Sequence, residues 1–447
     1  MNYSIIQKSQ LEGALRLDAE YYQPEYLQIR KNIQDLGFFN FSELIKSFSS
    51  GKNLQQTDDS NYPKFIRTQN VRPVLIDKDS MSYCTELKYP KLNYGDLLFV
   101  RVGEGVGNSS VVTKDFENST FSDNVIRILI KDINPFYVSV LLNSKIGSLL
   151  MESVKKGSAR SLISRENLNS LKIPKIQEEQ QQYFEEIVNQ AEKQILNSEE
   201  NYSQAEDLLL EELGLSSFAE ATEDKKDLSY IVNLSDIKSA HRVDAEYFQP
   251  KYDRLISKIK NQNAKLLLNA IENVPAKFNP QNQPEKKFKY VELANINPSI
   301  GVIDGFSEVL GKEAPGRAKR VLKTSDVIVS SVEGSLEKAA LVSEEQAGYL
   351  ASTGFFQFRS KEILPEVLLI LAKSPVFQMQ LQKQTAGTIL TAVPKEAIKN
   401  VLVPILPKPV QQKIADLVQK SHEARKEAKE LLEQAKQKVE KLIENKN

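Results

Sequence analysis

The segment LDAEYYQPEY at residues 17–26 occurs a second time as VDAEYFQPKY at residues 243–252. Later matches keep the same order: GDLLFV (95–100) with SDVIVS (325–330), Gly157 with Gly387, Pro174 with Pro404, and Gln181-Gln182 with Gln411-Gln412. In all of these later matches, the two copies are separated by the same number of residues, which we call the repeat offset. The repeat offset is slightly larger than the separation of the first pair. Several matches in one order indicate a tandem duplication. The small drift in their spacing indicates loop insertions within the duplicated unit.

Each copy is predicted to be a mixed α/β domain followed by a long helix. Pro24 and Pro250 suit the first turn of a helix, where a missing N–H costs nothing, and Gly37 can end the first of these helices. Short β-like runs, separated by Gly, Asn, Asp and Pro, predict three strands in each copy. They are predicted at 64–71, 96–102 and 124–130, and at 288–296, 326–332 and 354–358.

The clearest periodic pattern lies in the segments that end the two copies. Mostly apolar residues recur there at alternating spacings of four and three, which leaves one narrow stripe on a charged helix. Such a stripe favours a partner helix over the alternative, in which each helix packs only on its own domain. The stripe comprises Phe184, Val188, Ala191, Ile195, Ser198, Tyr202, Ala205 and Leu209, and, at the repeat offset, Ile414, Val418, Ser421, Arg425, Ala428, Leu432, Ala435 and Val439.

We therefore predict an α+β protein, in which two tandem α/β domains are separated by two long helices that form an antiparallel coiled coil. The helices are antiparallel if one leads out of the first domain and the other returns from the second, which gives a pseudo-two-fold internal repeat. The predicted segments are a first domain at 1–175, a helix at 176–215, a linker and second domain at 216–405, and a second helix at 406–447.

The composition excludes several classes of protein. The 447 residues include one cysteine, Cys84, and two histidines, His241 and His422, so a disulfide framework, a zinc site and a His-dependent triad are all poorly supported. No apolar run reaches the roughly 20 residues that cross a bilayer, and the first residues lack a signal-peptide pattern, so we expect a cytoplasmic protein. Because 59 basic residues balance 59 acidic ones, a nucleic-acid binder would need to gather its cations in patches.

The order of domain, long helix, domain and long helix resembles the specificity subunit of type I restriction–modification systems. The residues that carry this resemblance are the repeated DAEYYQPEY and DAEYFQPKY, with IPKIQEEQQQ (173–182) and VPILPKPVQQKI (403–414) entering the helices. In that family a proline-rich stretch precedes a Glu-Gln pair, which the first copy keeps as Glu179-Gln180, whereas the second has Val410-Gln411. The equivalent subunit of a type II enzyme built on this plan is a related interpretation.

The resemblance implies a non-catalytic, prokaryotic subunit that recognises a bipartite site in double-stranded DNA and serves in phage defence. It implies that two adenine methyltransferase subunits and restriction (translocase and nuclease) subunits assemble on the chain. S-adenosylmethionine, ATP and Mg²⁺ are implied only for those partners, and no cofactor, metal or catalytic residue is expected in this chain. In agreement, the sequence contains no G-x-x-x-x-G-K-[ST] loop.

Three strings keep an enzyme interpretation open. INPFY (133–137) is similar to the Asn-Pro-x-aromatic motif of adenine methyltransferases, but the second copy has Leu364-Pro365 where the first has Asn134-Pro135, which favours a proline that opens a helix. VGEGVG (102–107) becomes VEGSLE in the second copy. Asp77, Glu86 and Lys88 form a loose nuclease-like pattern. The alternatives are a stand-alone DNA-modifying enzyme, methyltransferase or nuclease, and a coiled-coil adaptor that binds only protein.

The copies differ most in their loops, at 51–64 against 276–287 and at 103–123 against 333–353, as two domains that recognise different sequences would. DNA contacts require cations at phosphates and polar groups at base edges. The predicted contacts of the first copy are Lys52, Arg67, Asn70, Arg101, Asn108, Lys155, Lys156, Ser158 and Arg160. Those of the second copy are Lys277, Lys286, Lys287, Lys289, Arg317, Lys319, Arg320, Lys323, Lys383, Gln384 and Thr388. The alternative for each charged member is an ordinary solvated charge.

Overall fold

The structure is a computed structural model that describes residues 5, 8, 22–86, 88–102, 105–154, 165–215, 229–385 and 392–444. The chain divides into two compact units, which we describe one at a time. Unit 1 comprises Met1–Ile195 with Arg425–Asn447, and unit 2 comprises Leu196–Ala424. The boundaries fall inside both long helices, so each unit contains one domain and part of each helix.

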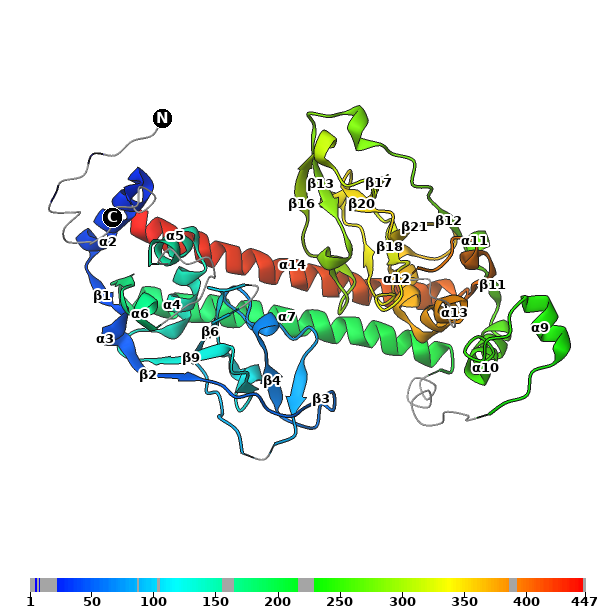
Figure 1. Ribbon diagram of the computed structural model, residues 1–447, viewed down its shortest axis with the longest axis horizontal. Coiled ribbons are helices and arrows are strands. Elements are labelled where there is room, and N and C mark those ends of the chain that lie inside the picture. The colour runs from blue at the N-terminus through cyan, green and yellow to red at the C-terminus, as the bar shows by residue number, and fades with distance from the viewer. Residues whose placement is uncertain are drawn as a thin grey trace. The chain divides into compact units, whose positions relative to one another are not determined.

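Unit 1 begins, in its described part, with helix α2 (Pro24–Leu36), which starts at Pro24 as predicted. Gly37 follows it with a φ of 78°, a left-handed conformation that glycine adopts without strain. A four-stranded antiparallel sheet follows, in the order β2-β9-β6-β7. Figure 1 labels β2, β9 and β6 of this sheet. Its strands are β2 (Ile45–Ser50), β9 (Val125–Ile130), β6 (Leu97–Val100) and β7 (Ser109–Val111).

The core of unit 1 lies between this sheet and several helices. Helix α4 (Pro135–Leu142) is apolar all round and buried, as a helix inside a core should be. Its side chains pack with Leu97 and Phe99 of β6 and with Phe184 of the first long helix. The remaining helices are α3 (Phe41–Leu44), α5 (Lys145–Val154) and α6 (Arg165–Asn169), and a short ribbon pairs β1 (Phe38–Asn40) with β10 (Lys172–Pro174).

A second sheet of unit 1 has the strand order β3-β5-β4-β8, and its β4–β8 pair is parallel. Its strands are β3 (Gln56–Thr57), β5 (Ser82–Cys84), β4 (Lys64–Ile66) and β8 (Thr120–Phe121). Cys84 on β5 is fully buried beside Phe65 and Leu54. Its thiol forms no disulfide.

Unit 2 has a sheet of the same order, β12-β21-β18-β19, and a ribbon that pairs β11 with β22. These strands are β12 (Ile271–Asn273), β21 (Phe355–Ser360), β18 (Val327–Ser330), β19 (Ala339–Leu341), β11 (Ala264–Leu266) and β22 (Leu402–Pro404). The helices are α9 (Leu234–Ala240), α10 (Pro250–Lys260), α11 (Leu267–Ala270), α12 (Pro365–Lys373) and α13 (Pro375–Thr385). Pro250 and Pro365 both open their helices, as predicted.

The second sheet of unit 2 has the order β16-β13-β20-β17, again with one parallel pair, β13–β20. Its strands are β16 (Ser307–Leu310), β13 (Lys287–Val291), β20 (Leu350–Ser352) and β17 (Ala318–Val321), and a small hairpin pairs β14 (Ile296–Asn297) with β15 (Val302–Ile303). All six strands predicted from the sequence are confirmed, although most are shorter than predicted.

The two long helices are α7 (Glu178–Glu212) and α14 (Lys408–Glu444). The predicted apolar stripe is buried along both, except that Ile195, Arg425 and Leu432 are only half-buried. Within unit 1, Gln194 Nε2 of α7 donates to Glu427 Oε2 of α14 at 2.8 Å. Within unit 2, the hydroxyl oxygens of Ser198 and Ser421 are 3.1 Å apart. Among the described residues, no helix is long and apolar enough to span a membrane.

Candidate nucleic-acid interface

The second sheet of unit 2 carries the densest group of exposed cations predicted from the sequence. Along β13, the exposed Lys287 and Lys289 alternate with the buried Phe288 and Tyr290. This alternation follows from the two-residue period of a strand, which turns one face to the core and the other to solvent. On β17, Lys319 is exposed between the buried Ala318 and Arg320.

Backbone hydrogen bonds bring further cations to the same sheet. The amide of Phe278 donates to the carbonyl of Lys319 at 3.1 Å, which places the exposed Lys277 next to β17. The amide of Thr353 donates to the carbonyl of Arg317 at 2.8 Å, at the end of β20. The structure therefore gathers on one sheet and its adjoining loops a set that we call the unit 2 cation face: Lys277, Lys286, Lys287, Lys289, Arg317, Lys319 and Lys323.

Arg320 is not part of this face. Its side chain is buried at 3% exposure, and its Nη1 donates to the carbonyl of Val274 at 2.7 Å. Burial lowers the pKa of the guanidinium to about 10, because a charge removed from water is disfavoured. We do not retain Arg320 as a DNA contact, since its donors face the protein interior.

The candidates on α13 have structural partners. Lys383 Nζ lies 3.1 Å from Asp253 Oδ1 on α10 and 4.9 Å from the ring centre of Tyr247. The carbonyl of Gln384 accepts a hydrogen bond from Arg242 Nη1 at 3.4 Å. These contacts hold α13 beside the repeated VDAEYFQPKY segment, so they explain Lys383 without a ligand. Thr388 lies outside the described residues.

In unit 1, Lys52 and Arg101 are exposed and come together at one end of the first sheet. Gly51 follows β2, and its amide donates to the carbonyl of Val125 at 3.3 Å. Arg101 follows β6, and its amide donates to the carbonyl of Asn124 at 3.0 Å. Both cations therefore flank the start of β9, the strand between β2 and β6.

Two other candidates of unit 1 belong to the fold. Asn70 is fully buried, and its Nδ2 donates to the carbonyls of Asp77 and Asp79 at 3.0 and 3.1 Å. Arg67 is half-buried, and its Nη2 donates to the carbonyl of Ser80 at 2.5 Å. We do not retain Asn70 as a DNA contact, because its amide is already hydrogen-bonded inside a loop.

Asn108 is half-buried, with its Nδ2 3.5 Å from the carbonyl of Val71. The four remaining candidates of the first copy, Lys155, Lys156, Ser158 and Arg160, lie outside the residues that the structure describes, so their contribution stays a prediction.

The methyltransferase-like string has a structural role in unit 1. Asn134 caps the start of α4, because its Oδ1 accepts the amide of Phe136 at 2.8 Å, and its Nδ2 donates to Glu185 on α7 at 2.6 Å. Its backbone amide donates to Gln181 Oε1 at 2.8 Å. In unit 2, the amide of Leu364 donates in the same way to Gln411 Oε1 at 2.9 Å. The glycine string 102–107 includes residues 103 and 104, which are not described.

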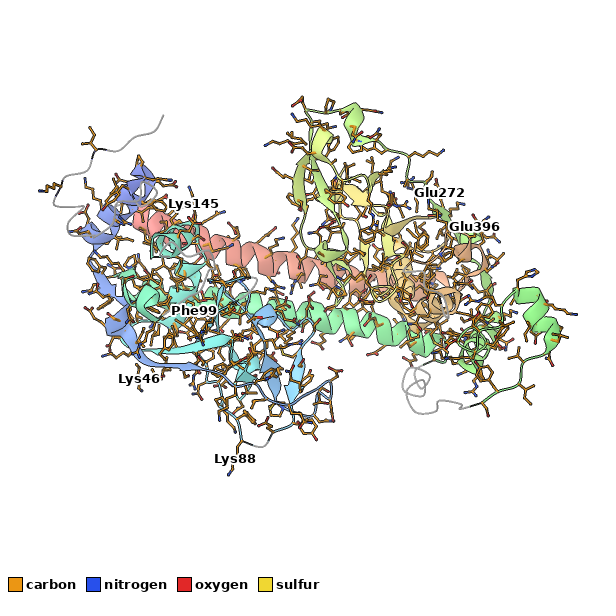
Figure 2. All side chains as sticks on the ribbon, viewed as in Figure 1. Lys46, Lys88, Phe99, Lys145, Glu272 and Glu396 are labelled. Atoms are coloured by element: carbon orange, nitrogen blue, oxygen red, sulfur yellow. The ribbon has the colours of Figure 1, made fainter. Side chains whose placement is uncertain are left out.

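The nuclease-like set also has local explanations. Glu86 Oε1 accepts the amide of Gln55 at 3.0 Å, and Asp77 Oδ1 accepts the amide of Asp79 at 3.0 Å. Burial is the main cause that raises the pKa of Asp77. Lys88 points outward at the edge of unit 1 (Figure 2). Within the described part of the chain, no group of three or more histidines, cysteines and carboxylates could hold a metal ion.

The two histidines occupy different environments. His241 is exposed and ends α9 in a left-handed conformation with a φ of 52°. His422 is packed in unit 2 with its ring 6.3 Å from that of Tyr202. Its Nε2 donates to the carbonyl of Ile300 at 2.8 Å, which requires the tautomer protonated there. Burial lowers the pKa of this imidazole.

Each unit has in its first sheet a buried carboxylate that was not predicted from the sequence. Asp96 is fully buried with its Oδ2 2.7 Å from Arg127 Nε. Asp326, its counterpart at the repeat offset, is also fully buried, and both of its oxygens accept hydrogen bonds from Arg359, at 2.9 and 3.2 Å. The repeated Gly-Asp and Ser-Asp before apolar strands are the pattern that could have indicated them.

Comparison with solved structures finds similarity across most of the chain. The S subunit of a type I restriction–modification system from M. genitalium is 11% identical, over 91% of this chain and 95% of that one, with a TM-score of 0.43. A chain from a study of complex assembly and conformational transition of the type I R-M system is 12% identical, over 92% and 98%, with a TM-score of 0.31.

The HsdS subunit from Thermoanaerobacter tengcongensis is 12% identical, over 92% of this chain and 97% of that one, with a TM-score of 0.30. No family model and no curated protein matches the sequence.

Proposed function

We propose that the chain is the non-catalytic, sequence-specific DNA-binding specificity subunit of a type I restriction–modification complex. One observation carries the proposal: two units share the strand order of their first sheet but differ in their second, and exposed cations gather on the second sheet of unit 2. A protein that recognises two different half-sites needs a common frame and two different surfaces. Cations on such a surface bind phosphates and orient the base-reading groups.

We further propose that α7 and α14 form an antiparallel coiled coil, and that the internal repeat has pseudo-two-fold symmetry. The buried stripe supports this arrangement, as do the Gln194–Glu427 contact in unit 1 and the Ser198–Ser421 contact in unit 2. From the first contact to the second, the residue number increases along α7, from Gln194 to Ser198, and decreases along α14, from Glu427 to Ser421, as it does in antiparallel helices. Symmetry of this kind matches a DNA site divided into two half-sites.

Two methyltransferase subunits and the restriction subunits would assemble on this frame. In the proposal, S-adenosylmethionine, ATP and Mg²⁺ bind to those partners and not to this chain. The roles found for Asn134, Glu86 and Asp77 in the fold support a non-catalytic chain, because each is already engaged within unit 1. The zero net charge of the chain fits a complex in which partners provide much of the non-specific affinity for DNA.

The test compares two double variants with equal loss of charge. Lys287→Gln/Lys319→Gln removes two members of the unit 2 cation face, whereas Lys260→Gln/Lys361→Gln removes two exposed lysines elsewhere in unit 2. DNA affinity is measured against salt concentration for the tagged full chain, purified with its bound subunits. We expect the first variant to lower the salt slope by up to about 2, at about 0.9 per phosphate contact, and the second to leave it unchanged. Equal slopes in both variants would remove the cation face from the interface.

A second assay separates the alternatives. The purified chain alone is tested for S-adenosylmethionine binding and for metal-dependent nicking of plasmid DNA. We expect neither, whereas either activity would establish an enzyme. Complete failure of the assembled complex to bind DNA would favour the protein-only adaptor.

A further inference from the structure

On the cation face of unit 2, one lysine differs from the others in its surroundings. Lys289 Nζ lies 4.7 Å from the ring centre of Phe306 and 5.0 Å from that of Tyr349. The two rings are 5.4 Å apart in an edge-on arrangement, and Tyr349 Oη is 3.2 Å from the same ammonium. Phe306 is nevertheless 42% exposed. We call these three residues the aromatic–lysine cluster.

The repeat provides the equivalent residue in unit 1 for comparison. Phe65 and Ile66 of β4 pair with Thr120 and Phe121 as Tyr290 and Val291 of β13 pair with Leu350 and Ala351. Lys64 and Lys289, which precede these residues, therefore occupy the same place in the two sheets.

The environments of the two lysines are nevertheless opposite. Lys64 is only 26% exposed, and its Nζ lies 2.6 Å from Asp115 Oδ2 and 2.7 Å from the Asp115 carbonyl. For Lys289, no carboxylate lies within ion-pair distance among the described residues. The same strand position thus holds a neutralised, structural lysine in one unit and an uncompensated, exposed one in the other.

We propose that the aromatic–lysine cluster contacts bases in the half-site recognised by unit 2, an inference that rests on the proposed function. The two rings and the tyrosine hydroxyl hold the ammonium in place, so less side-chain entropy is lost when it binds. An ordered ammonium can donate to the O6 and N7 acceptors of guanine in the major groove. The exposed face of Phe306 provides the apolar surface that contacts a thymine methyl group. The cluster therefore reads a guanine and a thymine in neighbouring base pairs, on the same strand or on opposite strands.

The experiment selects bound sequences from a random duplex library with the tagged full chain and its accompanying subunits. Lys289→Met keeps the aliphatic stem and Phe306→Ala removes the ring. We expect each variant to lose base preference at one or two adjacent positions of one half-site, with about tenfold weaker binding to the original site, the order of one good base contact. The other half-site should be unchanged in both variants.

Lys64→Met is the matched control, since it makes the same chemical change at the equivalent strand position. It should leave the selected sequence unchanged. Uniformly weaker binding of Lys289→Met and Phe306→Ala with an unchanged consensus would overturn base reading and leave only phosphate contact. Unchanged binding by both would overturn the cluster as an interface. If the parent complex itself selects no sequence, the proposed function fails rather than this inference.

Discussion

The two units have one sheet in common and one that differs, and the difference is confined to edges. The first sheets have the orders β2-β9-β6-β7 and β12-β21-β18-β19, and β6 and β18 start at Leu97 and Val327, which the repeat offset relates. The second sheets share three strands, but the fourth is β3 beside β5 in unit 1 and β17 beside β20 in unit 2. The duplicated sheet can therefore gain a strand at either edge, which changes the surface of the domain there without disturbing the core.

The length difference between the copies falls in the same region. Asn70 and Asn295 are equivalent, because each accepts a hydrogen bond from the amide three residues before it, at 3.0 and 2.9 Å. From these residues to the buried aspartates, Asp96 and Asp326, unit 2 is longer. The additional residues lie in the segment that contains β14 to β17, next to the proposed DNA-reading surface.

The largest expected difference between the units concerns the buried aspartates. Arg127→Ala should destabilise unit 1 by about 3–5 kcal/mol, because it leaves the fully buried Asp96 without its cation. Arg359→Ala should cost unit 2 less, about 1–3 kcal/mol, since Gln357 Nε2 still donates to Asp326 at 2.7 Å. Hydrogen exchange measured by mass spectrometry reports each unit separately, which avoids assuming two-state unfolding of a two-unit chain. Equal losses in the two units would show that Gln357 does not compensate.

The glutamines at the helix junctions should show a smaller difference. Gln411 is 1% exposed and links the Leu364 amide to the Leu406 carbonyl, whereas Gln181 is half-buried and links Asn134 to Ile176. Gln411→Ala should therefore cost about 1–3 kcal/mol, since it leaves buried groups unpaired, and Gln181→Ala about 0.5–1.5 kcal/mol, since water can replace it.

The exposed neighbours Gln412 and Gln182 serve as controls for this pair. Their replacement by alanine should change stability by less than about 0.5 kcal/mol. Thermal unfolding of the four variants provides the comparison. A greater loss for Gln181→Ala than for Gln411→Ala would contradict the expectation that the buried glutamine contributes more to stability.

The units should also respond in opposite directions to mild acid. Burial lowers the pKa of His422 in unit 2, so its stabilising contribution is present above an unfolded pKa of about 6.5 and is lost as the pH falls below it. Burial raises the pKa of Asp96 and of Glu192 in unit 1. The stabilising contribution of these two carboxyl groups is therefore present at low pH and is lost as the pH rises through their folded pKa values.

Between pH 7 and pH 5, unit 2 should therefore lose stability by at most about 1.4 kcal/mol per pH unit, the limit for one proton, and unit 1 should not. Hydrogen exchange corrected for intrinsic rates at each pH measures both. His422→Gln keeps a donor toward Ile300 and should abolish the loss in unit 2, and a loss that persists in this variant would assign it to another group.

Periodicity and duplication were enough to predict the two long helices, the helices that open at prolines and the repeated strands, because their patterns occur twice in the sequence. They were not enough to separate candidate DNA contacts from structural polar groups. Asn70 and Arg320 look like surface residues in a loop and a basic cluster, but tertiary packing buries both. Lys287 and Lys319 were predicted as individual cations, and only the strand pairing through β20 places them on one sheet. The burial of His422 could not be predicted, because its partner, the carbonyl of Ile300, is far away in the sequence.

The smallest expected net effect is that of a double variant at the contact between the helices in unit 2. Ser198 and Ser421 are fully buried with their hydroxyls 3.1 Å apart, while their counterparts at the repeat offset are Ala428 and Ala191, also buried, in unit 1. At the equivalent place in unit 1, the two helices therefore already have alanine in place of both serines. Ser198→Ala alone should cost about 1–3 kcal/mol at most, because it leaves the buried hydroxyl of Ser421 without its partner.

The double variant, Ser198→Ala/Ser421→Ala, should recover nearly all of this loss, since removing both partners of a buried hydrogen bond leaves no unpaired group. A double-mutant cycle measured by thermal unfolding gives the coupling energy directly. If the losses of stability in the two single variants simply add in the double variant, each serine contributes through packing that alanine cannot supply. That result would contradict the equivalence of this helix contact with the one in unit 1. A clear coupling energy would instead identify the serine pair as a polar replacement for the alanine pair, at the same position of a repeated helix contact.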